Sequence, residues 1–162
     1  MLSKSHLAIV LSKLEGFNKA SLVKEQYITD SEIAATVLYN ASALGDIEGN
    51  VIADLGCGTG ILGIGALLLG SRQVYFIDSD KEALEIAKKN ISKVKSEGYR
   101  LGKADFIHKN IVEFEGRVDV VIQNPPFGTK VKHYDALFLE KALKTAPVVY
   151  SLHKSETKGF LE

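Results

Sequence analysis

Hydrophobic residues recur along the chain with two different spacings. From residue 51 onward, short apolar runs alternate with longer stretches in which apolar residues recur every three or four positions. The short runs predict strands and the longer stretches predict helices. Strands are expected at about 51–53, 73–77, 104–108, 118–123 and 148–152. Helices are expected at about 61–69, 81–94 and 136–145, and a last one from Ser155 to Glu162.

Two more helices are predicted before the first strand. Residues 2–14 have near-helical apolar spacing, which ends at Gly16. The segment Thr29–Glu32 fits a capping box, with Thr29 as the cap of the next helix. An apolar stripe continues that helix to Gly45. We therefore expect one domain, residues 1–162, in which N-terminal helices (1–45) lie over the ligand site of a core (46–162).

Alternation of strands and helices defines the expected fold. Buried β-branched strands separated by helices favour an α/β protein with a doubly wound, mostly parallel sheet of the Rossmann-like kind. Ligands of such sheets bind at the carboxyl ends of the strands, where the winding reverses. Functional residues are therefore expected directly after Ala53, Ile77, His108 and Gln123.

Composition narrows the class of protein. The chain has 162 residues, 46% of them hydrophobic, which suits one domain. Its formal net charge is zero, so only a local basic face could bind nucleic acid. A single cysteine, Cys57, excludes an internal disulfide framework and a multi-cysteine zinc site, and we predict no metal site. Without a signal peptide or a long apolar run, a soluble cytoplasmic protein with no membrane contact is expected.

A glycine-rich loop follows the first predicted strand. Asp54–Gly60 opens a helix, and its glycines allow a ligand to approach the backbone closely. The overlapping Gly58–Gly63 also fits the dinucleotide fingerprint G-x-G-x-x-G. However, the carboxylate of Asp54 would repel a pyrophosphate and attract the ammonium group of a sulfonium cofactor. The loop therefore favours S-adenosylmethionine over a dinucleotide, and Gly58 and Gly60 belong to its predicted site.

Polar residues after the next two strands extend this predicted cofactor site. Asp78 closes the second strand, where an acid can accept both hydroxyl groups of an adenosine ribose. Asp80 competes for this role, but its place at a helix start equally suits a cap. Asn110 follows the third strand and could contact the adenine edge, or it could be an ordinary turn residue.

The most specific motif is Asn124-Pro125-Pro126-Phe127, directly after the fourth predicted strand. An exocyclic amine on an aromatic ring is a poor nucleophile because its lone pair is conjugated with the ring. The Asn124 side-chain oxygen and the Pro125 carbonyl can accept its N–H protons and make the nitrogen more nucleophilic. Phe127 offers a face on which a flipped base can stack. The motif predicts methyl transfer to an amino nitrogen, with adenine N6 as the best fit. The alternative is a Pro-Pro turn beside a core Phe.

Together these motifs resemble the amino-methyltransferase branch of the Rossmann-like (class I) methyltransferases. The similarity is closest to the small methyltransferase-like-five family, which methylates adenosine N6 in small-subunit ribosomal RNA, and to its archaeal relatives. The resemblance covers nearly the whole chain, in segments 16–17, 22–29, 46–48, 53–56, 124–129 and 149–155. It implies an enzyme that transfers a methyl group from S-adenosylmethionine to adenine N6 of RNA, above all ribosomal RNA.

The resemblance also assigns residues to roles. It places Asn124 to Phe127 at the adenosine. Thr29 has the competing role of a helix cap, and Tyr27 could line the pocket or only pack. The residues that the resemblance places around the cofactor are Gln26, Thr29, Gly56, Thr59, Ile61, Asp78, Asn110 and Ile111.

The chain departs from the family pattern in several ways. Ala20 and Ile28 replace usual prolines, and Asn110 replaces a common acid, so its adenine contact should be a weaker neutral hydrogen bond. The family continues with a helix and two strands that complete a seven-stranded sheet. Without those last two strands, the strand at 148–152 would be an exposed edge. Eukaryotic relatives bind a small zinc-containing activator subunit along a sheet edge, which makes such a partner possible here.

Basic residues near the motif suggest an RNA surface, although lysines on solvated loops are equally plausible. The loop 128–133 is basic, and His153, Lys154 and Lys158 follow the fifth predicted strand. Three other functions stay open: a protein glutamine N5-methyltransferase, which usually has Tyr in place of Phe127, a non-catalytic binding subunit, and a nucleotide oxidoreductase.

Overall fold

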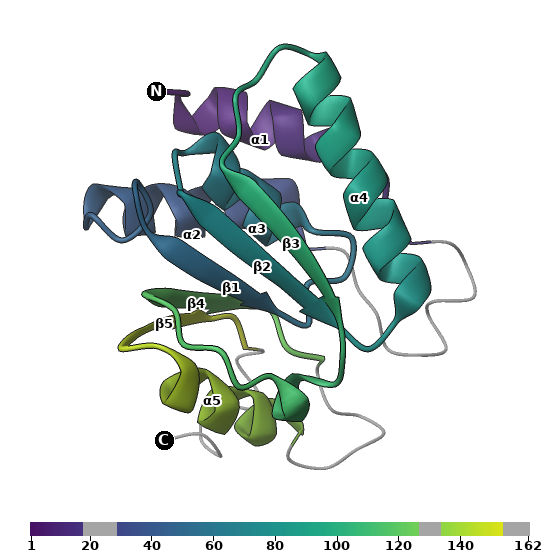
Figure 1. The fold of residues 1–162 in the computed structure, drawn as a ribbon. Coiled ribbons are helices and arrows are strands. Elements are labelled where there is room, and N and C mark those ends of the chain that lie inside the picture. Colours follow the sequence, from purple (N-terminus) through teal and green to yellow (C-terminus); the bar gives the residue numbers. More distant parts are fainter. Residues whose placement is uncertain (18–28, 127–133, 154–162) are drawn as a thin grey trace.

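The computed structural model describes residues 1–17, 29–126 and 134–153. Figure 1 shows the fold, in which helices lie on both sides of a central sheet. In chain order, the elements of the described residues are α1 (Lys4–Ser12), α2 (Ser31–Ala43), β1 (Val51–Leu55), α3 (Ile61–Leu68), β2 (Gln73–Asp78), α4 (Lys81–Ser96), β3 (Lys103–His108), the 3-10 helix η2 (Ile111–Glu113), β4 (Val120–Gln123), α5 (Tyr134–Thr145) and β5 (Val148–Ser151).

The five strands form one sheet in the order β3-β2-β1-β4-β5, and every neighbouring pair is parallel. The chain moves outward from β1 through β2 to β3, and then returns to the other side of β1 for β4 and β5. The winding therefore reverses between β1 and β4. This topology confirms the predicted doubly wound α/β fold.

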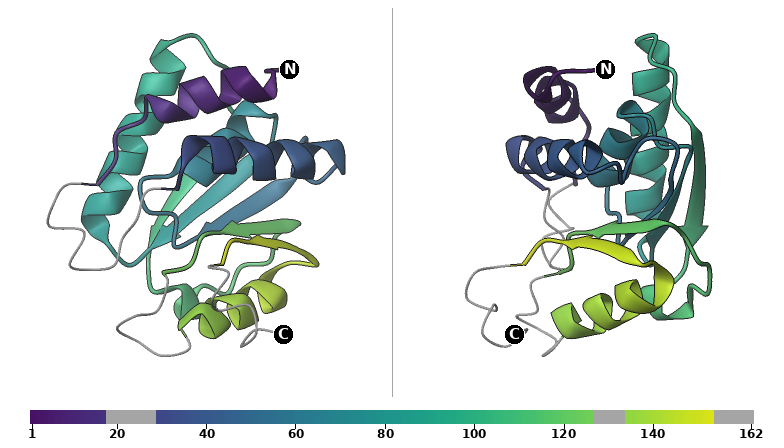
Figure 2. Two further views of the ribbon diagram at one scale, coloured as in Figure 1. Left: turned by 180° about the vertical axis from the view of Figure 1, so that it is seen from behind. Right: turned by 90° about the vertical axis from the view of Figure 1, so that its left-hand side faces the viewer.

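Alternating side chains of the strands build a separate apolar layer on each face of the sheet. Ile52 of β1 and Ile122 of β4 belong to the core shared with α1, α2, α3 and α4. Ala53 and Val121, the neighbours of these residues, belong to a second core with η2 and α5. Figure 2 shows α1 and α2 on one side of the sheet and α5 on the other. The molecule is thus a three-layer α/β/α arrangement.

Two strand boundaries differ from those expected from sequence. β1 continues two residues beyond the predicted end, so Asp54 lies within the sheet, opposite Phe76 and Ile122. β4 begins at Val120 rather than at Val118, because the backbone N–H of Val118 donates to the Thr145 carbonyl outside the ladder. The helix predicted from Ser155 to Glu162 lies outside the described residues.

The start of α2 corrects the predicted capping box. The N-cap is Asp30, whose carboxylate accepts the backbone N–H groups of Glu32 at 2.9 Å and Ile33 at 3.1 Å. Thr29 lies one residue before the cap, so the prediction that it caps this helix is wrong. Its hydroxyl group is consequently available for a different partner.

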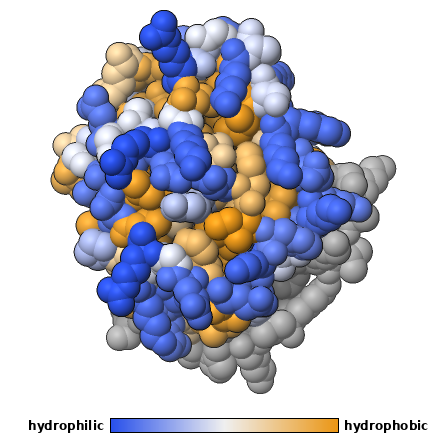
Figure 3. Space-filling view, in the orientation of Figure 1, coloured by the Kyte–Doolittle hydropathy of each residue, from blue (hydrophilic) through white to orange (hydrophobic). Residues whose placement is uncertain are grey.

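β3 and β5 are the two outer strands of the sheet. In the orientation of Figure 1, hydrophobic and hydrophilic residues are interspersed over the molecular surface (Figure 3). Among the described residues, no strand pairs with the outer edge of β3 or β5. The Tyr150 hydroxyl of β5 donates to the carboxylate of Asp46 at 2.5 Å, which ties this strand to the end of the α2 segment.

None of the described helices is long and apolar enough to cross a membrane.

Close packing fixes α3, the helix that follows the glycine loop. A Cβ atom at Gly63 would lie 2.3 Å from Cε1 of Phe76, a fully buried residue of β2. The Phe76 ring is itself stacked on Phe106 with centroids 5.0 Å apart, so it has little room to move. The absence of a side chain at Gly63 therefore allows α3 to approach the sheet.

We predict that Gly63→Ala destabilises the protein by about 1–3 kcal/mol, the usual cost of overpacking a core. The direction is informative because alanine normally stabilises a helix relative to glycine. Urea unfolding followed by circular dichroism measures this change. As the control, Thr36→Ala on the exposed side of α2 should change stability by less than about 0.5 kcal/mol. Equal stability of Gly63→Ala and the original protein would contradict the packing argument.

Candidate active site

The candidate site lies where β1, β2 and β4 end together. Leu55 of β1 is aligned with Ile77 of β2 on one side and with Gln123 of β4 on the other. The residues that follow these three, Gly56, Asp78 and Asn124, therefore continue from neighbouring positions at one edge of the sheet. The fold thus brings together three of the predicted site segments at the point where the winding reverses.

The glycine loop is held by bonds from its own backbone. Gly56, Gly58 and Gly60 have φ values of 67°, 55° and 92°, in the left-handed region that favours glycine. The N–H groups of Gly56 and Cys57 donate to the Ile77 carbonyl, and that of Gly60 donates to the Cys57 carbonyl. These N–H groups are therefore not available to bind a pyrophosphate, which disfavours the dinucleotide alternative.

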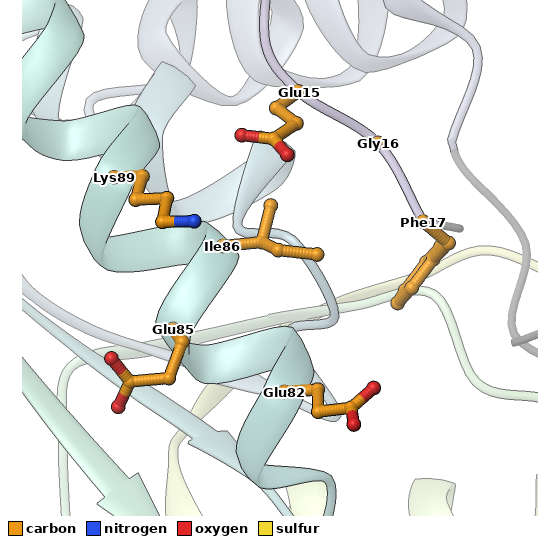
Figure 4. A pocket seen from close by; sticks show the side chains of 7 residues that line it. All are labelled: Glu15, Gly16, Phe17, Glu82, Glu85, Ile86 and Lys89. Atoms are coloured by element: carbon orange, nitrogen blue, oxygen red, sulfur yellow. The ribbon is translucent and has the colours of Figure 1, made fainter.

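Phe17 lies against the glycine loop. A Cβ atom at Gly58 would be 2.8 Å from Cζ of the Phe17 ring, so the loop and the ring are in close contact. Residues 15–17 face α4 across an open cleft of about 580 Å³ (Figure 4). The α4 side chains that line this cleft are Glu82, Glu85, Ile86 and Lys89. The segment after α1 therefore borders the loop, and its predicted role of covering a ligand site stays a prediction.

Asn90 of α4 is a site residue that sequence reasoning missed. Its side-chain N–H groups donate to the carbonyls of Thr59 and Glu15, both at 3.0 Å, and its oxygen accepts the Glu15 N–H at 2.8 Å. Asn90 is 1% exposed and uses every hydrogen bond that its N–H groups can donate. It joins the glycine loop to the segment after α1. In the sequence, its role is indicated only by the position of a polar Asn on the apolar side of α4.

Asp54 is buried beneath the loop. Its carboxylate accepts the backbone N–H of Gly63 at 2.9 Å. It therefore satisfies an N–H group in the first turn of α3 that the N-cap residue, Gly60, cannot bond because it has no side chain. Burial raises the pKa of Asp54 to about 7, the Gly63 N–H lowers it, and the nearby charge of Asp78 raises it further. Its predicted attraction for a cofactor ammonium group stays a prediction.

Asp78 connects the end of β2 to the loop. One carboxylate oxygen accepts the Gly58 N–H and the other accepts the Asp80 N–H, each at 2.8 Å. Burial raises the pKa of Asp78, while these N–H groups oppose the shift. Asp80 caps α4 by accepting the Glu82 N–H at 2.9 Å, which confirms its predicted capping role. Asp54 and Asp78 thus place two carboxyl groups, each bonded to a backbone N–H, at this part of the site.

Asn110 and Ile111 follow β3 at the same edge of the sheet. The Asn110 oxygen caps η2 by accepting the Val112 N–H at 3.1 Å, which confirms the turn alternative. Ile111 is buried in the core beneath α5. The cofactor contacts predicted for these two residues, and for Thr59 and Ile61, which are also buried, stay predictions.

Asn124 has one bonded and one unbonded side-chain atom. Its Nδ2 donates to the Thr29 hydroxyl oxygen at 2.8 Å. Its Oδ1 is buried and has no hydrogen-bond partner among residues 1–17, 29–126 and 134–153. Because an amide is planar, the bond to Thr29 fixes the direction in which this oxygen points. Pro125 is buried next to it and has no N–H that could compete as a donor. The site thus presents an oriented, unsatisfied acceptor.

Some predicted residues cannot be placed in this arrangement. Gln26, Tyr27, Phe127, the basic loop 128–133, Lys154 and Lys158 lie outside the described residues. His153 is described, and its ring is close to Ser151 and Asp135 rather than open to solvent. This position is unfavourable for the phosphate binding suggested for His153 from the sequence.

Comparison with known proteins identifies the family. Residues 30–149 match the protein family described as the methyltransferase small domain. The chain belongs to the methyltransferase small domain family. As a family member it has the predicted class I methyltransferase fold and is a transferase.

Individual relatives agree with this assignment. Protein MJ0284 of Methanocaldococcus jannaschii is 39% identical over 99% of this chain and 75% of that protein. The rRNA N(6)-adenosine-methyltransferase METTL5 of Danio rerio is 35% identical over 94% of this chain and 74% of that protein. The crystal structure of PH1948 from Pyrococcus horikoshii, a proposed RNA methyltransferase, is 46% identical with a TM-score of 0.89 and covers 100% of this chain and 80% of that chain.

Asp54 makes the stability of this methyltransferase depend on pH. Its pKa is about 7 in the folded protein against 3.8 normally, so folding binds a proton between these values. The stability contributed by Asp54 is therefore present at low pH and is lost as pH rises toward 7. We predict that Asp54→Asn increases stability relative to the original protein above pH 7, by up to about 4 kcal/mol, with little change near pH 4.

Urea unfolding at several values from about pH 4 to pH 8 tests this sign. Asp30→Asn is the control, because Asp30 is exposed and Asn caps a helix as well as Asp. Parallel curves of stability against pH for Asp54→Asn and the original protein would contradict the prediction.

Proposed function

We propose that this protein transfers a methyl group from S-adenosylmethionine to N6 of adenine in RNA, and that ribosomal RNA is the substrate. The observation that carries the proposal is the buried Oδ1 of Asn124 beside the glycine loop, which no described residue bonds. An acceptor of this kind fits an N–H group of the substrate. The rRNA N6-adenosine methyltransferases among the relatives support adenine as the base.

The described residues fit S-adenosylmethionine. The cofactor carries positive charge on its sulfonium and ammonium groups, and the carboxylates of Asp54 and Asp78 provide a negative site for them. Asp78, at the end of β2, is where a carboxylate can accept the ribose hydroxyl groups. Gly58 and Gly60 allow the left-handed backbone turns that shape the loop beside this site. The cofactor supplies an activated methyl group.

The residues of the chain then act mainly by positioning the amine. Asn124 Oδ1 and the Pro125 carbonyl accept the two N–H protons, which directs the nitrogen lone pair out of the base plane and toward the methyl carbon. The nitrogen–carbon bond forms as the carbon–sulfur bond breaks. The nitrogen is positively charged after transfer and releases a proton to solvent. Correct placement of reacting groups can supply much of such a rate enhancement.

A non-catalytic binding subunit explains the site less well. A buried acceptor without a partner costs about 1–3 kcal/mol, because it has lost its bonds to water. A protein that kept only the fold would gain nothing from this loss of stability at Asn124. A protein glutamine offers a chemically similar amide nitrogen, and the identity of the methylated product separates it from adenine.

We also propose that the protein acts in the cytoplasm together with an activator subunit. The outer edges of β3 and β5 are not paired by any described residue, so either edge could accept a strand of a partner. We therefore propose that a small zinc-containing activator binds along a sheet edge, as the resemblance to the methyltransferase-like-five family implies.

We predict that Asn124→Ala lowers methyl transfer at least 100-fold, because removal of a single oriented group of this kind costs about 10²–10³ in rate. Cofactor affinity should change less than about threefold, because Asn124 contacts the substrate. The assay offers labelled S-adenosylmethionine with ribosomal RNA, transfer RNA, DNA and release-factor protein, and then analyses digested nucleosides. The expected product is N6-methyladenosine from ribosomal RNA.

The control variant for this assay is Asn50→Ala. Asn50 is a half-buried asparagine just before β1, at the opposite end of that strand, and its side-chain Nδ2 donates to the Gly45 carbonyl at 3.1 Å. Its replacement should leave transfer unchanged. Label found only on protein, or transfer that survives Asn124→Ala, would overturn the adenine assignment.

Thr29 should contribute by orienting Asn124. Thr29→Val keeps the shape of the side chain but removes the hydroxyl bonded to Asn124 Nδ2. One hydrogen bond contributes about 1 kcal/mol, and about 1.4 kcal/mol is tenfold in rate, so kcat should fall about five- to tenfold. Thr29→Ser, which restores the hydroxyl, should recover most of the activity. Equal kcat values for Thr29→Val and Thr29→Ser would show that the bond has no part in catalysis.

A further inference from the structure

A second set of polar side chains lies on the other face of β4. The Gln123 Nε2 donates to the Ser151 hydroxyl oxygen at 2.9 Å. The Ser151 oxygen is 2.7 Å from Nε2 of His153, and Nδ1 of His153 is 3.6 Å from a carboxylate oxygen of Asp135. We call these four residues the relay. It connects the ends of β4 and β5 to the first turn of α5.

The relay is partly buried and incompletely bonded within the described part of the chain. Gln123 is fully buried, and Asp135 is 5% exposed. Three of its buried atoms have no hydrogen-bond partner among the residues that the structure describes: Gln123 Oε1, His153 Nδ1 and Asp135 Oδ2. Polar atoms buried without partners cost stability, and apolar residues would fill the same space at less cost. Such unsatisfied groups in a core require an explanation beyond packing.

Hydrogen-bond chemistry orders the contacts of the relay. The Gln123 Nε2 donates to the Ser151 oxygen. That oxygen is in turn 2.7 Å from Nε2 of His153, and the tautomer of the imidazole decides which of the two donates. In the tautomer that carries its hydrogen on Nδ1, the Ser151 hydroxyl donates to Nε2 and the Nδ1 hydrogen faces the Asp135 carboxylate, 3.6 Å away.

The order of Ser151, His153 and Asp135 resembles that of a nucleophilic triad. In such a triad the serine oxygen is free to attack a substrate. Here the Gln123 amide donates to that oxygen, which lowers its nucleophilicity. The relay is therefore suited to holding its neighbours in place rather than to attacking a substrate.

The relay begins directly beside the candidate catalytic residue. Gln123 precedes Asn124, and the alternation of β4 places Gln123 toward α5 and Asn124 toward Thr29. The backbone is tied at the same point, because the Leu152 N–H donates to the Gln123 carbonyl at 3.0 Å. A shift of Asp135 or His153 would therefore be transmitted through Ser151 to the backbone that carries Asn124.

We propose that His153 and Asp135 are positioning residues for methyl transfer, which act through Ser151 and Gln123 to fix the acceptor oxygen of Asn124. This inference rests on the proposed function, because it assigns the relay to the same site. Thr29 fixes the Asn124 side chain from one face of the sheet, and the relay fixes the Asn124 backbone from the other.

The test uses Asp135→Asn, His153→Ala and the pair Ser151→Ala and Ser151→Thr in the methyl-transfer assay. Asp135→Asn, His153→Ala and Ser151→Ala should each lower kcat about tenfold or more, with cofactor Kd changed less than about twofold. Ser151→Thr keeps the hydroxyl and should recover at least half of the activity. Glu140→Gln, an exposed carboxylate on α5, and His6→Ala, an exposed histidine on α1, are the matched controls and should retain full activity.

A purely structural brace gives a different pattern. In that case kcat, cofactor affinity and Tm would fall in parallel, and this outcome overturns the proposal. Unchanged kcat in Asp135→Asn and His153→Ala overturns it as well, and so does equal activity of Ser151→Ala and Ser151→Thr.

A second measurement does not depend on activity. The side-chain N–H resonances of Asn124 in a ¹⁵N-labelled protein report its position directly. They should shift in Asp135→Asn and His153→Ala and stay unchanged in Glu140→Gln. If the original protein methylates none of the RNAs, the proposed function fails, whereas unshifted Asn124 resonances in the relay variants reject the inference about the relay.

Discussion

The register of three parallel strands is the constraint on which the site depends. Leu55 is aligned with both Ile77 and Gln123, so the glycine loop, Asp78 and Asn124 leave the sheet side by side. A slip of one residue in β1 would turn Asp54 to the other face of the sheet and break its bond to Gly63. Two buried cores on opposite faces of the sheet oppose such a slip, because it would exchange their side chains. The packing of the core therefore determines the geometry of the site.

Around this edge, buried polar groups have replaced apolar packing on both faces of β4. Thr29 bonds the Asn124 side chain from one face, and Gln123 bonds Ser151 on the other. Both arrangements leave an acceptor oxygen, on Asn124 and on Gln123, without a partner in the described part of the chain. A protein selected only for stability would fill these positions with apolar residues. The pattern is typical of a site that accepts a loss of stability in order to hold reactive groups in place.

The sequence predicted those features that depend on local pattern. The strands, the helices, the Asp80 cap and the turn at Asn110 follow from apolar spacing and from residue types within one turn. Long-range partners could not be predicted in this way. Thr29 and Asp30 are both good caps, and Asn124, 95 residues away, is the partner that the Thr29 hydroxyl has instead. The same limit applies to Asn90, whose bonds to Glu15 span 75 residues.

The two buried carboxylates connect ligand choice with stability. In the free protein, burial raises the pKa of Asp54 and of Asp78, so each charged carboxylate is held in an unfavourable environment. A cationic ligand lowers the energy of both charged forms, whereas a pyrophosphate raises it. A ligand that binds only the folded state also stabilises that state. Binding of a cation should therefore stabilise this protein more as pH rises and the carboxylates ionise. The charge that favours a sulfonium cofactor over a pyrophosphate therefore also offsets the electrostatic cost of the two buried carboxylates.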